Sequence, residues 1–208
     1  LLDIILRESD RLNRTVTDFL AYARPAPHAP TFFDIRHEVA DAIALLANSD
    51  DVGPRHEIVS ELPDGEVIFY GDQNQLRQVF WNLCRNGLQA MPEGGVLTVT
   101  LAPVQGGGVQ LAVGDTGVGM SAQQKDQLFL PFSSTKVGGT GLGMATVYQF
   151  VKDHDGRIEV VSDVGVGTRI VLHLPGRSTS AAELPLTGPR VHAAISADTD
   201  AATKPARS

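Results

Sequence analysis

The stretch VLTVTLAPVQGGGVQLAVGDTGVGM (residues 96–120) decides the fold class of this chain. Its first six residues alternate apolar and polar side chains, three glycines then turn the chain, and a second alternating run returns, which predicts a β-hairpin. Asp115, Gly117 and Gly119 come directly after the second strand. A carboxylate there can accept a hydrogen bond, for instance from the exocyclic amine of a purine, and glycines let the backbone lie against a ring or a phosphate. The same spacing occurs in ordinary turns, whereas a calcium loop would need further carboxylates that do not follow.

A second segment, NLCRNGLQA (residues 82–90), ends a helix predicted over residues 72–90 with Asp72 as its N-cap. Asn82 and Asn86 are four residues apart and therefore share one face of that helix. An amide oxygen is a neutral, hard ligand that suits Mg²⁺. Taken alone, two asparagines on a helix are more often ordinary surface residues, so the interpretation of this segment as a Mg²⁺ site depends on the other segments.

Two further segments lie in a glycine-rich stretch, residues 114–143, that we expect to be mostly irregular. FLPFSSTK (residues 129–136) places two phenylalanines where no strand or helix is predicted, and we interpret them as anchors of a mobile lid over about residues 120–138. GTGLG (residues 139–143) precedes a helix predicted over residues 144–154, and the free N–H groups at such a helix start bind anions. The segment is not a Walker loop, because no Gly-Lys-Ser/Thr follows, and its place in the chain does not fit a dinucleotide fingerprint.

The rest of the chain supplies strands and helices around these segments. Residues 1–24 form a predicted helix with an apolar seam at heptad spacing, which either packs on its own domain or forms one arm of a helical hairpin in a dimer. A proline-rich linker (25–30), the main domain (31–176) and a tail predicted to be disordered (177–208) follow. Further strands are predicted at residues 31–35, 57–61, 67–70, 157–162 and 168–174, and a further helix at residues 36–47.

Composition restricts the function classes. The net charge is −7, so neither a nucleic-acid partner nor an anionic membrane surface is expected. The single cysteine, Cys84, excludes an internal disulfide and favours a reducing cytosol. No apolar run approaches the ~20 residues that a membrane span needs. The chain begins with Leu1 rather than methionine, so we expect a cytoplasmic fragment of a protein that upstream segments could anchor in the inner membrane.

Together the four segments resemble the N, G1, F and G2 boxes of the GHKL ATP-binding superfamily, in the order found in sensor histidine kinases. GVGT (residues 165–168) resembles the G3 element, and the resemblance covers roughly residues 1–175. The run NGLQA (residues 86–90) and the short lid are most similar to the nitrogen-regulation branch of these kinases. The resemblance implies a two-layer α/β sandwich, in which a mixed sheet of about five strands packs on three helices, preceded by one helix of a dimerisation hairpin.

The resemblance also implies a substrate, ATP with Mg²⁺, and the residues that bind it. Asp115 would bind the adenine amino group with Thr168 beside it. Asn86 would hold the Mg²⁺ that bridges the phosphates, Asn82 would line the same site and take part in catalysis, and Lys136 would reach a phosphate from the lid. The full set of implied nucleotide-binding residues is Asn82, Asn86, Asp115, Gly117, Gly119, Lys136, Thr140, Gly141, Leu142, Gly143 and Thr168.

Two positions set this chain apart within the superfamily. Many relatives carry a basic residue where this chain has Gln89, so either one phosphate contact is lost or Lys136 or Arg85 replaces it. The ATPase branches carry a glutamate at the position of Asn82, as a base for water. An amide cannot take that proton, so the site suits phosphoryl transfer to another nucleophile better than hydrolysis. The alternative is a nucleotide-binding scaffold or an ATPase without transfer to histidine.

The nucleophile that the resemblance implies is a histidine on the dimerisation domain of a homodimer, from which a response-regulator aspartate receives the phosphoryl group. Residues 1–24 resemble the second helix of that domain, and its first helix, with the acceptor, is expected upstream of Leu1. None of the six histidines fits the acceptor motif. His37, followed by Glu38, comes closest, but it falls in a predicted helix of the main domain and is expected to be structural.

Overall fold

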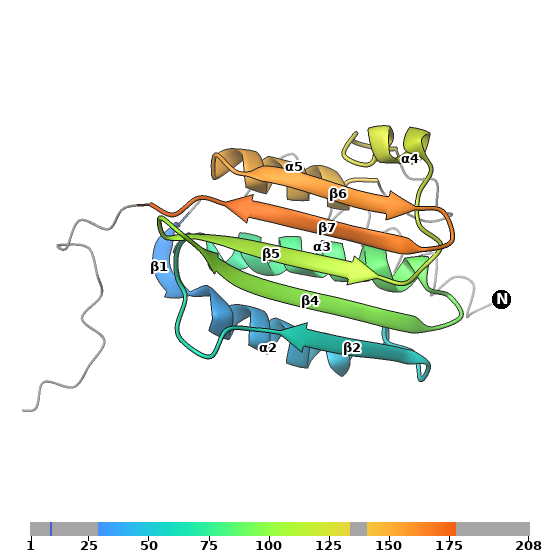
Figure 1. The fold of residues 1–208 in the computed structure, drawn as a ribbon, viewed down its shortest axis with the longest axis horizontal. Helices are drawn as coiled ribbons and strands as arrows, with labels where there is room; N and C mark the ends of the chain where they lie inside the picture. The colour runs from blue at the N-terminus through green and yellow to red at the C-terminus, as the bar shows by residue number, and fades with distance from the viewer. Residues whose placement is uncertain (1–8, 10–28, 134–140, 178–208) are drawn as a thin grey trace, which may run out of the picture.

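Residues 29–133 and 141–177, together with Ser9, are described by the computed structural model of the chain (Figure 1). A five-stranded sheet forms one layer, and helices on one of its faces form the other. In chain order the elements are β1 (Thr31–Asp34), α2 (Ile35–Ala47), β2 (His56–Glu61), β3 (Ile68–Gly71), α3 (Gln73–Ala90), β4 (Gly95–Val104), β5 (Gly108–Asp115), α4 (Ala122–Gln127), α5 (Gly143–Asp153), β6 (Arg157–Asp163) and β7 (Gly167–Leu174).

The main sheet has the strand order β2-β4-β5-β7-β6. β2 and β4 run parallel and the other neighbours are antiparallel, so the sheet is mixed. Helices α2, α3 and α5 cover one face, and Figure 1 looks onto the other. This confirms the predicted sandwich of about five strands and three helices. The predicted first and third strands, β1 and β3, pair with each other in a separate two-stranded sheet.

Alternation along the strands places one set of apolar side chains against the helices. Leu97 and Val99 of β4 are buried there, and Leu111 and Val113 of β5 continue the row. Helix α3 lies between α2 and α5, and its apolar residues recur at three- and four-residue spacing. The buried residues of α3 are Leu76, Val79, Phe80, Leu83, Cys84, Gly87 and Leu88. The core therefore holds α3 against the strand end at which the candidate site lies.

The start of α3 confirms a prediction made from sequence. Asp72 is its N-cap, and the carboxylate accepts hydrogen bonds from the backbone N–H groups of Asn74 and Gln75. An N-cap carboxylate satisfies N–H groups that have no partner inside the helix.

The glycine-rich stretch 114–143 was predicted to be mostly irregular, and within it the structure contains one short helix, α4, that was not predicted. Ser121 and Gln124 form a capping box at its start, in which each side chain accepts a hydrogen bond from the other residue's backbone N–H. The helix has only six residues and none of them is buried, so no apolar periodicity reveals it in the sequence. The capping box was the available signal.

Residues 1–8, 10–28, 134–140 and 178–208 lie outside the described residues. The predictions of an N-terminal helix (apart from Ser9), of the linker up to residue 28 and of a disordered tail from residue 178 fall there. In the part of the chain that the structure describes, no helix is both long enough and apolar enough to cross a membrane.

Candidate functional site

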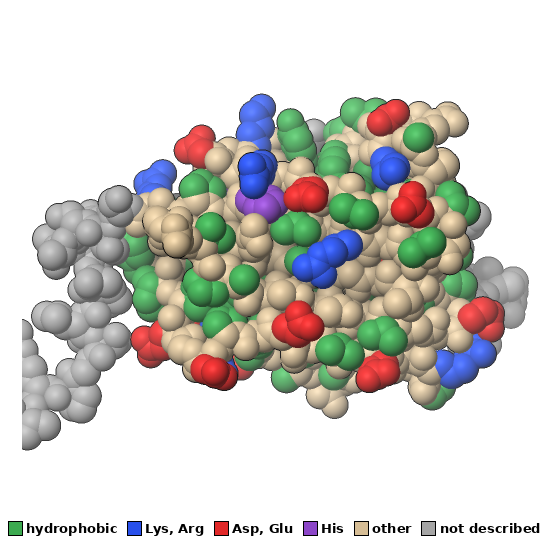
Figure 2. Space-filling view, in the orientation of Figure 1, with side chains coloured by type: hydrophobic (Ala, Val, Ile, Leu, Met, Phe, Trp, Pro, Cys, Tyr) green, Lys and Arg blue, Asp and Glu red, His purple; other side chains and the backbone are tan. Residues whose placement is uncertain are grey.

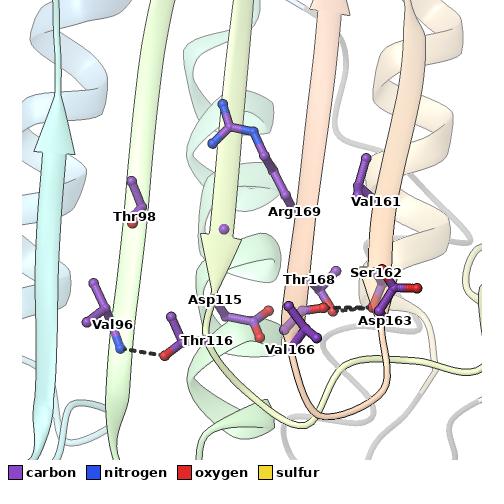
Figure 3. A pocket seen from close by; sticks show the side chains of 12 residues that line it. Val96, Thr98, Asp115, Thr116, Val161, Ser162, Asp163, Val166, Thr168 and Arg169 are labelled. Atoms are coloured by element: carbon purple, nitrogen blue, oxygen red, sulfur yellow. Dashed lines mark hydrogen bonds between the residues drawn. The ribbon is translucent and has the colours of Figure 1, made fainter.

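Asp115 ends β5, and its side chain faces the helical layer. Its backbone pairs with Thr168 of β7, so the two side chains lie at the same end of the sheet (Figure 3). The carboxylate oxygen Oδ1 of Asp115 accepts a hydrogen bond of 2.9 Å from the N–H of Gly117. A Cβ at Gly87 of α3 would stand 3.4 Å from the Cβ of Asp115 and 2.7 Å from Cδ1 of Leu97. Glycine at position 87 therefore allows α3 to approach the strand that carries Asp115.

The glycine-rich loop after β5 is held between the end of α3 and the turn that joins β6 to β7. The N–H of Val118 donates to the carbonyl of Ala90 (3.0 Å), and the carbonyl of Val118 accepts from the N–H of Gly165 (2.8 Å). Gly119 has a φ of 64°, and a Cβ there would collide with the carbonyl of Asp163. The loop crosses the end of the sheet at close range, which requires glycine at position 119.

Asn82 and Asn86 lie one turn apart on α3, and both are half-buried. The amide nitrogen Nδ2 of Asn82 donates to the carbonyl of Gly143 at 3.1 Å. This hydrogen bond joins α3 to the first residue of α5 and leaves the amide oxygen of Asn82 as an acceptor. Asn82 therefore lies beside the start of α5, and Asn86 follows one turn later on the same helix.

Gln89 and Arg85 lie on the same helix. Gln89 is exposed. Arg85 is directed at the loop between α2 and β2, where its Nε lies 3.2 Å from Oδ2 of Asp51 as an ion pair without an aligned hydrogen bond. A role for Arg85 in place of the basic residue that many relatives carry stays a prediction.

Helix α5 begins at Gly143, with Leu142 as its N-cap. Leu142 is apolar and 1% exposed, and it makes no side-chain cap hydrogen bond. The carbonyl of Gly141 accepts from the N–H of Phe132 at 3.2 Å, so the segment predicted to form a lid contacts the residues just before the helix. Within residues 141–177, no side-chain carboxylate accepts hydrogen bonds from the first N–H groups of α5 in the way that Asp72 does for α3. N–H groups at a helix start that no side chain caps favour an anionic ligand. Thr140 and Lys136 lie outside the described residues.

The two phenylalanines of the predicted lid differ. Phe129 is half-buried against the core, with its ring centroid 5.9 Å from that of Tyr148 on α5. Phe132 is 66% exposed and has a φ of 64°, which is unusual for a bulky side chain. The interpretation of Phe132 as an anchor was therefore wrong for this structure, because its ring is directed at solvent.

Sequence reasoning missed Ser162, a serine of β6 that is 3% exposed. Its hydroxyl oxygen accepts from the N–H of Met120 (2.9 Å), donates to the carbonyl of Gly167 (3.0 Å) and lies 2.9 Å from Oγ1 of Thr168. Its carbonyl accepts from Nζ of Lys125 at 3.0 Å. Ser162 thus joins the glycine-rich loop, the β6–β7 turn and the lid helix. The available signal was a serine where the alternation of β6 requires an inward-facing residue.

A hollow of about 260 Å³ lies on the other side of this end of the sheet (Figure 3). The side chains of Thr98, Val161 and Arg169 stand around it, and Gly114 and Gly167 form part of its wall. It opens on the face away from the helices, and Asp115, Ser162 and Thr168 also belong to its lining. Figure 2 shows acidic, basic and apolar side chains interspersed over this open face.

The buried thiol of Cys84 is uncharged. Burial inside α3 raises its pKa well above the usual range of a cysteine. Among the described residues, no group of three or more His, Cys, Asp or Glu side chains could hold a metal ion. A metal ion here would therefore depend on amide and ligand oxygens.

Residues 71–178, about half of the chain, match the family described as histidine kinase-, DNA gyrase B- and HSP90-like ATPases. The chain belongs to this family. Sensor histidine kinase ZraS of Escherichia coli K12 is 36% identical over 178 residues, which are 84% of this chain and 37% of ZraS. Full-length ShkA in complex with AMPPNP is 28% identical, with a TM-score of 0.67 over 86% of this chain and 39% of ShkA.

Histidine kinase ThkA in complex with the response regulator TrrA has a TM-score of 0.69 over 84% of this chain and 50% of ThkA. At 21% identity this likeness shows the fold alone. The chain spans less than half the length of curated relatives that it matches, 37% of ZraS and 41% of sporulation kinase C of Bacillus subtilis. In the structure, α3 connects the other two segments, because Gly87 approaches Asp115 and Asn82 is bonded to Gly143.

Proposed function

We propose that the chain is the catalytic region of a sensor histidine kinase, which binds Mg-ATP and transfers the γ-phosphoryl group to a histidine. The observation that carries this proposal is the meeting of three features at one end of the domain. They are the strand-end carboxylate of Asp115, the asparagine face of α3, and the start of α5 to which Asn82 is bonded. The acceptor would be a histidine on the dimerisation domain of a homodimer.

Each site residue has a role in this proposal. Asp115 accepts a hydrogen bond from the adenine amino group, and Thr168 lies beside that contact. The glycines of the loop after β5 border the nucleotide. Residues 140–143 are proposed to contact the phosphates at the start of α5, where N–H groups and the helix dipole favour negative charge, and Lys136 is proposed to contact a phosphate as well.

Asn86 is the proposed protein ligand of Mg²⁺. Its amide oxygen is a hard, neutral donor, and the described residues offer no cluster of carboxylates in its place. That donor set fits an ion held mainly by nucleotide phosphates with one protein ligand, which is how Mg²⁺ is commonly bound. When bound, Mg²⁺ neutralises charge that develops on the phosphate groups.

Asn82 favours phosphoryl transfer over hydrolysis of ATP. Its Nδ2 already donates to Gly143, and its amide oxygen has no proton affinity suited to general-base catalysis of water attack. Positioning and charge neutralisation supply most of the catalysis in phosphoryl transfer, so a site without a base is sufficient when another domain brings the nucleophile. The second candidate, a nucleotide-binding scaffold or ATPase, has no comparable observation in its favour.

The wider setting of the protein follows from the same proposal. After transfer to histidine, the phosphoryl group would pass to the aspartate of a response-regulator receiver domain, a class of partner bound by the structural neighbour ThkA. The domain would work in the cytoplasm, and the NGLQA run at residues 86–90 supports the nitrogen-regulation branch as its subfamily.

The test uses the chain with radiolabelled ATP, alone and with a separately added dimerisation domain that carries an acceptor histidine. We expect acid-labile label on the added domain and none on the chain. Label mapped to any of the six histidines of the chain would overturn the proposed place of the acceptor.

Calorimetry tests the nucleotide site itself. Asp115→Ala should weaken ATP binding by on the order of 1–3 kcal/mol, because the adenine amine loses its acceptor. The matched control is Asp64→Ala, which removes an exposed carboxylate between β2 and β3 and should leave the affinity unchanged. Asn86→Ala should reduce the Mg²⁺ dependence of binding; full retention of that dependence would refute the metal role.

A further inference from the structure

The side chains of Asp115, Thr168 and Ser162 form a row across three neighbouring strands. Asp115 of β5 pairs with Thr168 of β7, which pairs with Ser162 of β6. All three lie at the end of the sheet shown in Figure 3, where the bond between Thr168 and Ser162 is drawn. The row begins at the proposed nucleotide site and ends at a serine that is 3% exposed. The protons along this row can be assigned from its hydrogen bonds.

Ser162 has one hydroxyl proton and two lone pairs. The N–H of Met120 can only donate, so one lone pair of Ser162 accepts from it at 2.9 Å. The carbonyl of Gly167 can only accept, so the single proton of Ser162 is donated to it at 3.0 Å. In the contact of 2.9 Å with Oγ1 of Thr168, Ser162 has no proton left and must therefore accept.

The hydroxyl of Thr168 consequently donates its only proton to Ser162. Its remaining lone pairs can only accept, and the neighbouring group, the carboxylate of Asp115, also only accepts when ionised. Directly paired residues on one face of a sheet have Cβ atoms about 5 Å apart. Two acceptors on directly paired residues suit a group that offers two N–H bonds, and they repel a carbonyl oxygen.

We propose that Ser162 is a positioning residue that fixes Thr168 as an acceptor and thereby makes the site select a 6-amino purine over a 6-oxo purine. This inference rests on the proposed nucleotide site and adds to it a determinant of base specificity. Ser162 does not touch the nucleotide; it acts through the direction of one proton on Thr168. Without Ser162, the Thr168 hydroxyl can rotate and donate to an oxygen at position 6.

The test compares binding of ATP and inosine triphosphate, which differ at position 6 of the base, to the full chain and to Ser162→Ala. Loss of the serine should weaken the binding of both nucleotides, because Met120 and Gly167 lose a hydrogen-bond partner. The ratio of the two affinities, however, should fall about tenfold toward equality, because only the 6-oxo base gains a donor. If Ser162 merely held the loop, both affinities would fall by the same factor, and that result would overturn the inference while leaving the proposed function intact.

Two variants of Thr168 keep the test decisive even if Ser162→Ala does not fold. Thr168→Ser retains the hydroxyl and should keep the affinity ratio of the unchanged chain. Thr168→Val has nearly the same shape without the hydroxyl, so the ratio of the ATP affinity to the inosine triphosphate affinity should fall. An unaltered ratio would contradict the inference. Ser60→Ala, an exposed serine on the edge strand β2, is the control and should change neither affinity. If the unchanged chain binds neither nucleotide, the proposed function fails together with this inference.

Discussion

Helices α3 and α5 lie side by side in one layer, but their N-termini are built in opposite ways. The start of α3 is closed by Asp72, whose Oδ1 accepts from Asn74 (2.9 Å) and Gln75 (3.2 Å) while Oδ2 accepts from the N–H of Ala29 (3.2 Å). The start of α5 has the apolar Leu142 as its N-cap. One helix therefore carries its own anion at its N-terminus, whereas among the described residues no side-chain carboxylate caps the other, where the free N–H groups favour an anionic ligand.

The difference separates a structural helix start from a functional one. Asp72 is 9% exposed, so its carboxylate is part of the fold and binds Ala29, in the predicted linker, to the start of α3. The start of α5 lies next to Asn82 and to the end of the lid, where binding of an anion would connect several segments at once. The predictions below exchange or perturb these two arrangements.

The largest effect is expected from placing a carboxylate at the start of α5. Gly143→Asp puts a negative charge where the phosphates are proposed to bind, and like charges in close contact cost several kcal/mol, so ATP affinity should fall on the order of 100-fold or more. Gly143→Asn is the control, since its added Cβ meets the same contact, 3.3 Å from Cγ of Asn82. Calorimetry at low and high salt measures both variants. Equal losses in the two variants would show that charge plays no part.

A smaller effect, on stability rather than binding, is expected at the other helix. Asp72→Ala removes the cap of α3 and should lower the free energy of unfolding by about 1–2 kcal/mol. Asp72→Asn keeps an acceptor for the helix N–H groups and should lose less. Denaturant unfolding measures both variants. Affinity for ATP should stay unchanged while the domain is folded, and a loss of binding without a loss of stability would break the contrast between the two helices.

Amide hydrogen exchange should show the same contrast without any mutation. Helix α4 has no buried residue and is six residues long, so residues 120–133 should exchange readily in the free chain. An ATP analogue should slow exchange in those residues and in the first turn of α5, but not in the first turn of α3. Uniform slowing, or none, would count against a lid that closes over a nucleotide.

The smallest effect concerns Cys84, on the buried face of α3. Because its pKa is raised in the folded state, the thiol stays protonated when the unfolded chain would ionise near pH 8.5. Its contribution to stability is therefore complete below that pH and declines as the pH rises above it. At pH 8 a thiol reagent should modify Cys84 only as fast as the domain unfolds. Rapid modification of folded protein would show that α3 is less firmly packed than its burial indicates.

Local chemistry explains which features could be predicted from the sequence. The β4–β5 hairpin and the Asp72 cap depend on residues that are close in sequence. The alternation of apolar and polar residues was therefore sufficient to predict the hairpin, and a single carboxylate was sufficient to predict the helix start. The pairing of β1 with β3 joins residues far apart in sequence, and no local pattern encodes it. The same is true of the row that ends at Ser162, whose partners come from the loop after β5 and from β7. Helix α4 was missed for a different reason, because a solvent-exposed turn has no apolar period.

The most direct test of the central claim is a titration of the isotope-labelled chain with a non-hydrolysable ATP analogue and Mg²⁺, followed by backbone amide resonances. We expect saturable shifts at Gly117 and at Met144 and Ala145, in the first turn of α5, with the resonances of Asn74 and Gln75 unmoved. Saturable binding that shifts Asn74 and Gln75, or that leaves the first turn of α5 unchanged, would contradict the assignment of the nucleotide phosphates to the start of α5.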